Sequence, residues 1–199
     1  MQTNDLEKTR FAGDYIVGLK ACLDALSLEQ IAALLEKLEA AYWNGKQVFI
    51  IGNGGSAATA AHMACDLSNN VVHLDGDQPR FRVMSLADNV PLMTALANDR
   101  GYEFIFSEQL KNLCQPGDLL IAISGSGNSP NILAAIQTAK TIGATVVGIL
   151  GFDGGKAKDL VDSYVHVQSD HYGFIEDVHM VLDHLVTAYF KTKMNLGRE

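Results

Sequence analysis

Residues 48–56 read Val48-Phe49-Ile50-Ile51-Gly52-Asn53-Gly54-Gly55-Ser56, an apolar run that ends in a glycine- and serine-rich loop. The pattern recurs at residues 119–129, which read Leu119-Leu120-Ile121-Ala122-Ile123-Ser124-Gly125-Ser126-Gly127-Asn128-Ser129. A strand that ends in such a loop and turns into a helix presents backbone N–H groups and the positive end of the helix dipole to an anion. Serine hydroxyls add further donors. Two such loops predict a site for a phosphate-bearing ligand, with plain structural turns as the alternative.

Strands and helices alternate along residues 46–199. The expected strands are residues 47–51, 82–86, 119–123, 145–150 and 163–167. The expected helices are residues 56–67, 90–97, 102–113, 130–142 and 175–191. This alternation predicts an α/β fold with a mostly parallel, doubly wound sheet that helices cover on both faces. Ligands bind such sheets outside the carboxyl ends of the strands, where both loops lie.

Residues 1–45 lie outside this alternation and carry apolar residues at helical spacing. They predict a helical hairpin whose second helix is capped by Ser27, with Gln30 three residues later as in a capping box. The hairpin either covers the sheet or packs on a partner chain, and we favour oligomerisation. The leucines expected to be buried in one of these two ways are Leu19, Leu23, Leu34 and Leu38. The chain is thus expected to be one domain, 1–199, with the hairpin at 1–45 and an α/β core at 46–199.

The composition limits the classes of function that the chain can have. With 199 residues, 48% of them hydrophobic, the chain is long enough for one domain with a full core. A formal net charge of −8 disfavours a nucleic-acid surface, so backbone amides and hydroxyls must hold any phosphate. Three scattered cysteines without a CxxC motif predict neither a disulfide framework nor a cysteine zinc site. The sequence has no signal-peptide pattern and no membrane-length apolar run, which predicts a cytoplasmic protein without membrane contact.

Two histidines and two carboxylates are the candidates for chemistry. His62 and Asp66 are four residues apart and share one face of a predicted helix. Glu176 and His184 are eight residues apart, a spacing of about 80° around the helix axis that lets them converge on one site. The set suits a metal such as zinc, or an acid/base pair that moves a proton next to a carbonyl. Ordinary roles stay open: a helix contact for His62, a solvated carboxylate for Asp66, and a dipole-complementing first turn for Glu176.

The other histidines and the Asn98-Asp99 pair are expected to have structural or surface roles. His179 is predicted to be structural, and the other histidines, His73, His166 and His171, to lie on the surface or in loops. Asn98-Asp99 follows an apolar helix and is typical of a helix C-cap or turn.

Taken together, these motifs resemble the sugar isomerase (SIS) domain family, and within it the phosphoheptose isomerases. The resemblance covers nearly the whole chain. The matching motifs are Asn53-Gly54-Gly55-Ser56 followed by His62 and Leu67, then Asn98-Asp99, then Ser124-x-Ser-Gly-Asn-Ser129, then His179 and His184.

The resemblance implies an isomerase that interconverts sedoheptulose 7-phosphate and an aldoheptose 7-phosphate, in a homotetramer with composite sites. Proton transfer falls on Asp66 and His184. The residues implied to bind the substrate and its phosphate are Asn53, Gly54, Gly55, Ser56, Asn98, Asp99, Ser124, Ser126 and Ser129. Some members of the family bind zinc, with ligands that fall on His62, Asp66, Glu176 and His184. No nucleotide cofactor is implied.

Departures from the family pattern leave the sugar open. The catalytic carboxylate is usually Glu and here is Asp66, and a family Gln is replaced by Glu176, whose charge favours a metal. Asn69-Asn70 stands where a substrate-contacting Arg is expected, and Gly173-Phe174 replaces an Asp-Arg pair. The alternative is a non-enzymatic branch, a tetramer that binds a replication initiator protein or senses a sugar phosphate. That branch lacks the carboxylate and the second histidine that this chain retains.

Overall fold

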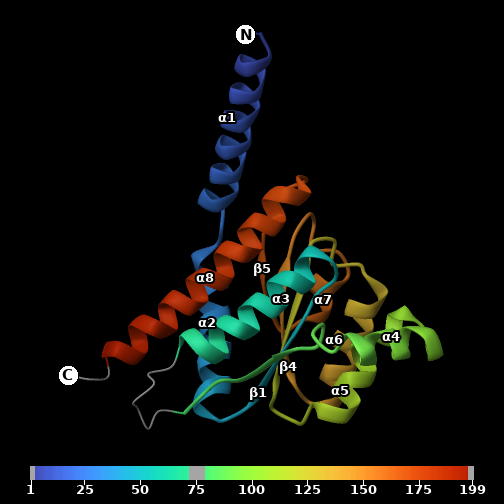
Figure 1. Ribbon diagram of the computed structural model, residues 1–199. Coiled ribbons are helices and arrows are strands. Elements are labelled where there is room, and N and C mark those ends of the chain that lie inside the picture. Colours follow the sequence, from blue (N-terminus) through green and yellow to red (C-terminus); the bar gives the residue numbers. More distant parts are fainter. Residues whose placement is uncertain (1–2, 72–78, 197–199) are drawn as a thin grey trace.

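A five-stranded parallel sheet forms the centre of the molecule in the computed structural model, which describes residues 3–71 and 79–196 (Figure 1). Its strands are β1 (Gln47–Ile51), β2 (Arg82–Ser85), β3 (Leu119–Ser124), β4 (Thr145–Leu150) and β5 (Ser163–His166). They lie in the order β2-β1-β3-β4-β5, and every neighbouring pair is parallel. The predicted α/β fold with a parallel sheet is confirmed.

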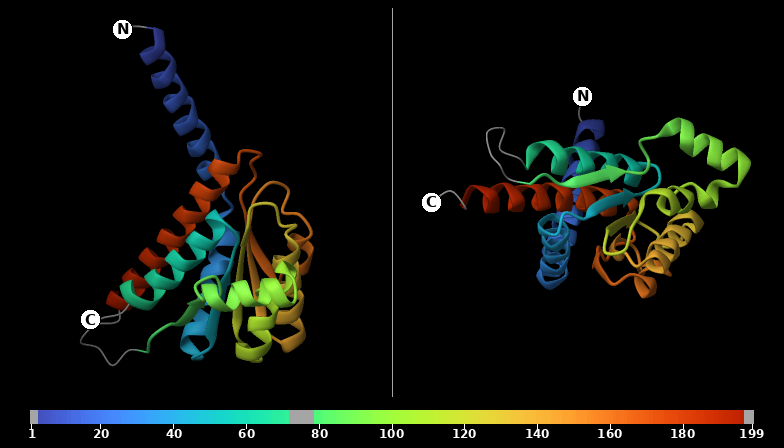
Figure 2. Two further views of the ribbon diagram at one scale, coloured as in Figure 1. Left: turned by 45° about the vertical axis from the view of Figure 1, so that its right-hand side comes forward. Right: turned by 90° about the horizontal axis from the view of Figure 1, so that it is seen from below.

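Helices cover both faces of the sheet and make three layers (Figure 2). The helices are α1 (Thr3–Asp24), α2 (Leu28–Trp43), α3 (Gly55–Cys65), α4 (Val90–Asp99), α5 (Ser107–Leu113), α6 (Pro130–Ile142), α7 (Ala157–Leu160) and α8 (Tyr172–Leu196). α2, α3 and α8 pack in the core on one face, and α5, α6 and α7 in the core on the other. The helix expected at 102–113 is split into a 3₁₀ turn at Tyr102–Phe104 and α5.

Alternating side chains of the strands feed the two cores. In β1, Val48 and Ile50 point into the core beneath α2, α3 and α8, whereas Phe49 and Ile51 point into the core beneath α5 and α6. All residues of β3 are buried. A central strand that is buried at every position is what a parallel sheet covered on both faces requires.

The two N-terminal helices differ in what they contact. α2 belongs to the core, and its Leu34 and Leu38 are 0% exposed. α1 projects away from the body, and its C-terminal part reaches the same core through the partly buried Leu19 and Leu23 (Figure 1). These four predicted leucines therefore pack within the chain itself. The apolar residues of α1 left exposed are Leu6, Phe11, Ile16 and Val17.

Polar contacts fix how these helices join the body. The Ser27 hydroxyl accepts the Gln30 N–H at 3.2 Å, which confirms the predicted cap. The Gln30 side chain does not close a capping box; its Oε1 accepts the backbone N–H of His166 at 2.9 Å. His166, expected in a loop or on the surface, is therefore buried at the end of β5, while His73 lies outside the described residues. Within the described ranges, no helix combines the length and apolar character needed to cross a membrane.

Candidate functional site

The two glycine- and serine-rich loops meet at the carboxyl edge of the sheet. They follow β1 and β3, which are hydrogen-bonded neighbours, and lead into α3 and α6 on opposite faces. In open α/β sheets this change of face, the topological switch point, is where ligands bind. The Asn53 and Asn131 amides join the loops by reciprocal hydrogen bonds of 2.9 and 2.7 Å.

A small pocket lies between the loops. Its lining residues are Asn53, Ser56, Ile123, Ser124, Gly125, Ser126, Ser129 and Tyr172, without a charged side chain among them. The N-cap residues of α3 and α6, which border it, make no side-chain cap. In α6 Pro130 has no N–H and the Ile132 N–H donates to Asn131 Oδ1 at 3.0 Å, so the N–H groups at the start of α3 are the main ones available to an anion. The pocket thus brings together the four predicted serines and Asn53, and it offers amides and hydroxyls in place of cations.

The serine hydroxyls of the second loop are oriented by its own backbone. Ser124 Oγ accepts the Gly127 N–H at 3.1 Å, and Ser126 Oγ accepts the Asn128 N–H at 3.3 Å. A hydroxyl that accepts one hydrogen bond still has its own proton to donate. These contacts leave the O–H donors free for a ligand oxygen.

The loop after β4 holds the second serine loop in place. Gly151 N–H donates to Gly125 O at 3.0 Å, and Ala157 N–H donates to Gly127 O at 2.9 Å. Gly127 has φ +60°, and a Cβ added there would overlap the Gly154 carbonyl oxygen. Only glycine combines this backbone angle with such a close approach.

The other predicted substrate residues lie around or away from this pocket. Gly54 is the N-cap of α3 and Gly55 its first residue, so both border the loop without lining the pocket. Asn98 and Asp99 end α4, where the Asn98 amide donates to the Asp99 carboxylate at 2.8 Å in an exposed position. Contact of these four residues with substrate stays a prediction.

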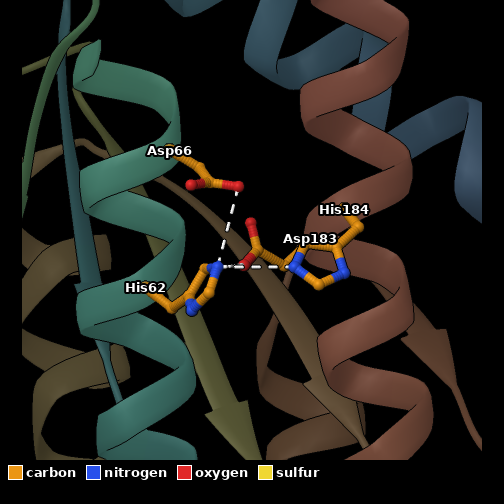
Figure 3. Close-up of side chains that lie close together, drawn as sticks. All are labelled: His62, Asp66, Asp183 and His184. Atoms are coloured by element: carbon orange, nitrogen blue, oxygen red, sulfur yellow. Dashed lines mark hydrogen bonds and ion pairs between the residues drawn. The ribbon is translucent and has the colours of Figure 1, made fainter. Parts of the chain in front are cut away.

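A second group of polar side chains lies between α3 and α8. His62, Asp66, Asp183 and His184 point toward one another, and their ligand atoms lie within 4.8 Å of each other (Figure 3). His62 Nε2 is 3.3 Å from His184 Nε2, 3.7 Å from Asp66 Oδ2 and 3.9 Å from Asp183 Oδ2. Asp66 opens a π-helical turn, Asp66–Asn70, and accepts a 2.7 Å hydrogen bond from the Asn70 amide. We call these four residues the His/Asp cluster.

The members of the His/Asp cluster differ in burial, and therefore in how costly it is for each of them to carry a charge. The Asp183 side chain is 0% exposed and that of Asp66 12%, whereas that of His62 is 45% exposed. Burial, together with the neighbouring Asp66 carboxylate, raises the pKa of Asp183 to about 6, against the opposing effect of the two histidines. The cluster therefore combines groups that can exchange protons near neutral pH with groups that bind metals.

Asp183 takes the place that the sequence pattern gave to Glu176. α3 and α8 run side by side in the same direction: Glu176 lies against Gly55, and His184 against His62 (Figure 2). Eight residues of α-helix advance about 12 Å, and in this structure the Glu176 carboxylate lies beside Gly55, outside the His/Asp cluster. The prediction considered rotation about the axis and neglected this rise. The signal that it missed is an Asp in the same turn as His184, directly after the apolar stripe residue Leu182.

The pocket and the cluster occupy opposite ends of α3. Ser56 stands at the helix N-terminus, and His62 follows six residues later, about 9 Å along the axis. Asp66 is about 15 Å from Ser56 by the same measure. Within one chain the His/Asp cluster is therefore not part of the pocket between the serine loops.

His179 is buried beside the cluster. It is 1% exposed, and neither ring nitrogen has a hydrogen-bond partner among the described residues. Burial lowers its pKa from 6.5 to about 4. A histidine kept neutral in this way fits the structural role that was predicted for it.

The His179 shift predicts a loss of stability in mild acid. Between pH 6.5 and about 4 the unfolded chain binds a proton that folded His179 resists, so this contribution falls as the pH falls. The shift corresponds to about 3 kcal/mol. His179→Leu should therefore lose less unfolding free energy than the wild type between pH 7 and 4, measured by urea titration. The raised pKa of Asp183 has the opposite effect: its contribution to stability is lost as the pH rises from 3.8 through about 6. This effect is present in both the wild type and the variant. Parallel pH profiles would contradict the prediction.

Comparison with known proteins agrees with this geometry. The SIS domain family matches residues 14–151. A probable phosphoheptose isomerase of Thermoplasma acidophilum is 34% identical over 176 residues, which cover 88% of this chain and 94% of that protein. The phosphoheptose isomerase of Mycobacterium bovis is 39% identical over 176 residues, 88% of each chain.

Solved structures agree as well. A phosphoheptose isomerase from Neisseria gonorrhoeae superimposes with a TM-score of 0.84 at 25% identity, covering 96% of this chain and 100% of that one. One from Francisella tularensis gives a TM-score of 0.85 at 27% identity, covering 94% and 98%. The chain therefore belongs to the sugar isomerase (SIS) domain family, as an enzyme of the phosphoheptose isomerase type.

Proposed function

We propose that the chain interconverts an aldose and a ketose of a phosphorylated sugar, with sedoheptulose 7-phosphate as substrate. The observation that carries the proposal is the pair of joined serine loops at the switch point of the sheet, with the His/Asp cluster at the other end of α3. The proteins named above as phosphoheptose isomerases support the choice of sugar. Because sugar phosphates are intracellular metabolites, we also propose a cytoplasmic location.

The phosphate binds in the pocket between the serine loops. The hydroxyls of Ser56, Ser124, Ser126 and Ser129 and the N–H groups at the start of α3 donate to its oxygens. The positive ends of two helix dipoles offset part of its charge. Asn53, paired with Asn131, keeps the two loops at a fixed distance.

Asp66 and His184 move the proton. One removes the proton on the carbon next to the carbonyl, and the other protonates the neighbouring carbon or oxygen of the enediol-type intermediate. Their separation from Ser56 along α3 is bridged by an open-chain sugar with its phosphate at the far end, or by groups of a neighbouring chain in a composite site. A positioned acid or base of this kind contributes about 10²–10⁴-fold to the rate.

A divalent metal such as zinc fits the His/Asp cluster. Imidazole and carboxylate are its ordinary ligands. A cation would also stabilise the buried Asp183 carboxylate, which accepts no hydrogen bond among the described residues. His62, Asp66 and His184 would hold the ion. When bound, it would polarise the carbonyl and hydroxyl oxygens of the substrate.

An assay with sedoheptulose 7-phosphate tests the reaction. Purified protein, with and without added zinc, should form the aldose, followed by a coupled or chromatographic measurement. Absence of turnover with this and with other ketose phosphates of five to seven carbons would refute the isomerase proposal. The non-enzymatic alternative is not favoured, because the relatives named above are isomerases and the acid/base pair is present.

Removing single hydroxyls should weaken phosphate binding. Ser124→Ala and Ser126→Ala each delete one hydrogen bond to a charged group, worth about 1.5–3 kcal/mol of sugar-phosphate binding free energy. The fold should be retained, because Ser124 is the last residue of β3, Ser126 lies in the loop after it, and neither belongs to the two apolar cores. Calorimetry against Ser163→Ala, a serine in the edge strand β5, gives the control. Unchanged affinity in both loop variants would contradict the phosphate site.

The exposed apolar residues of α1 support a homo-oligomer, which we propose to be a tetramer. Light scattering should give a mass of several times the 21.5 kDa chain at micromolar concentration. Phe11→Asp with Val17→Asp should lower that mass, because a charge on an apolar contact costs free energy. Leu113→Asp, at an exposed position at the end of α5, is the control. A stable wild-type monomer would remove the basis for composite sites.

A further inference from the structure

We propose that Tyr102 is a positioning residue of the pocket between the serine loops. Its hydroxyl fixes the Asn53 side chain so that this amide offers N–H, and not C=O, to the phosphate. The inference rests on the proposed function, because it concerns how the same pocket takes up its ligand. Tyr102 is not among the residues that line the pocket, and the sequence motifs do not include it.

Tyr102 reaches the pocket from a third segment of the chain. It opens the 3₁₀ turn Tyr102–Phe104, which follows α4 and packs against α6. Within the turn, the Phe104 N–H donates to Gly101 O at 3.1 Å. The Tyr102 hydroxyl donates to Asn53 Oδ1 at 3.1 Å. One hydrogen bond therefore joins the segment after α4 to the loop after β1.

The hydrogen bonds around Asn53 determine which way its amide points. Asn53 Oδ1 accepts both the Tyr102 hydroxyl and the Asn131 Nδ2 group, the latter at 2.7 Å. Asn131 Oδ1 in turn accepts Asn53 Nδ2 at 2.9 Å and the Ile132 backbone N–H at 3.0 Å. Because a backbone N–H can only donate, it sets the direction of the amide pair, and Asn53 Oδ1 must accept.

The network leaves Asn53 with one way of contacting a ligand. A carbonyl oxygen has two lone pairs, and Tyr102 and Asn131 occupy both of those on Asn53 Oδ1. Asn53 Nδ2 has two protons, of which one goes to Asn131 and the other has no acceptor among the described residues. Since Asn53 lines the pocket, this N–H is available to a phosphate oxygen. Without the Tyr102 hydroxyl, one lone pair would be unpaired and the amide would be held less firmly.

Binding measurements on the full-length protein test the role of Tyr102. The probes are inorganic phosphate and sorbitol 6-phosphate, which has no carbonyl group and cannot isomerise. Tyr102→Phe removes only the hydroxyl and should weaken the binding of both by about three- to tenfold, the effect of one hydrogen bond between neutral groups. With sedoheptulose 7-phosphate, KM should rise by the same factor, and kcat should stay within about twofold of the wild type. Tyr164→Phe, on the edge strand β5 and outside the pocket lining, is the matched control.

A double-mutant cycle separates the positioning of Asn53 from a general effect on the fold. In an Asn53→Ala background the amide is absent, so adding Tyr102→Phe should change phosphate affinity by less than about twofold. Tyr102 is 55% exposed, and Tyr102→Phe should melt within about 2–4 °C of the wild type. In NMR spectra, the side-chain amide signals of Asn53 should shift or broaden in Tyr102→Phe, a measurement that does not depend on the folding of Asn53→Ala.

Three results would overturn the inference: wild-type affinity in Tyr102→Phe, a loss confined to kcat, or the same loss of affinity in the Asn53→Ala background as in the wild type. The proposed function fails in a different way. Wild-type protein that binds neither probe would refute the phosphate pocket, and the role of Tyr102 with it. Binding that depends on Tyr102 without turnover of any sugar phosphate would support the positioning role and refute the isomerase.

Discussion

Replacing His184 with alanine should lower kcat for the sugar-phosphate isomerisation by about 10²–10⁴-fold, the usual contribution of a positioned acid or base. Asp66→Asn should cause a loss of the same order, because the amide can neither take nor give the proton. Both side chains are in the His/Asp cluster, outside the pocket between the serine loops. The loss should therefore fall on kcat, with phosphate affinity retained.

Steady-state kinetics and direct titration of an inert sugar phosphate separate the two effects. His171→Ala, which removes an exposed histidine before α8, is the control. Two active variants, or a loss confined to KM, would show that Asp66 and His184 do not transfer the proton.

Gly127→Ala should disrupt the second serine loop. The residue has φ +60°, and a Cβ would overlap the Gly154 carbonyl oxygen, so the loop must move away from the neighbouring turn. The left-handed backbone costs about 1–2 kcal/mol for a residue other than glycine. Overpacking adds about 1–3 kcal/mol. Because Ser124 Oγ accepts the Gly127 N–H, phosphate binding should fall with the stability.

Gly45→Ala gives a matched control. Gly45 has φ +61°, and an added Cβ would meet nothing within 4 Å, so only the backbone term applies. Urea unfolding should give a loss for Gly127→Ala that exceeds the Gly45→Ala loss by the overpacking term. Only Gly127→Ala should lose sugar-phosphate affinity. Equal losses in both properties would mean that the contact with Gly154 does not support the loop.

The strands and the loops between them could be predicted because local chemistry determines them. Short apolar runs such as 119–123 that end in glycines and alternate with helices are typical of inner strands of a covered sheet, and the glycines mark turns. The course of α1 could not be predicted, because amphipathic spacing identifies a buried face without identifying what covers it. Leu34 is buried in the core, whereas Phe11 is exposed.

The candidate site was predictable where one short segment forms it. His62 and Asp66 share one face of the first helix after β1, and the structure keeps them together. Which residue of α8 lies beside His62 and Asp66 depends on the axial alignment of α3 and α8. Residue spacing within one helix does not give that alignment. That axial alignment places Asp183 beside His62, and Glu176 beside Gly55. The burial of His166 was also missed, because its neighbour in space, Gln30, is far away in the sequence.

α3 connects the serine loops to the His/Asp cluster, and its length sets the distance between them. One end carries Ser56, the other His62 and Asp66, and every residue between them adds about 1.5 Å. In the proposed mechanism, the number of residues in this helix would fix, within a chain, how far from its phosphate a bound sugar reacts. Inserting one helical turn would move the reacting groups by about 5.4 Å, close to the length of four carbon–carbon bonds in an extended chain. Sugars would then be sorted by length before their hydroxyl stereochemistry has any influence.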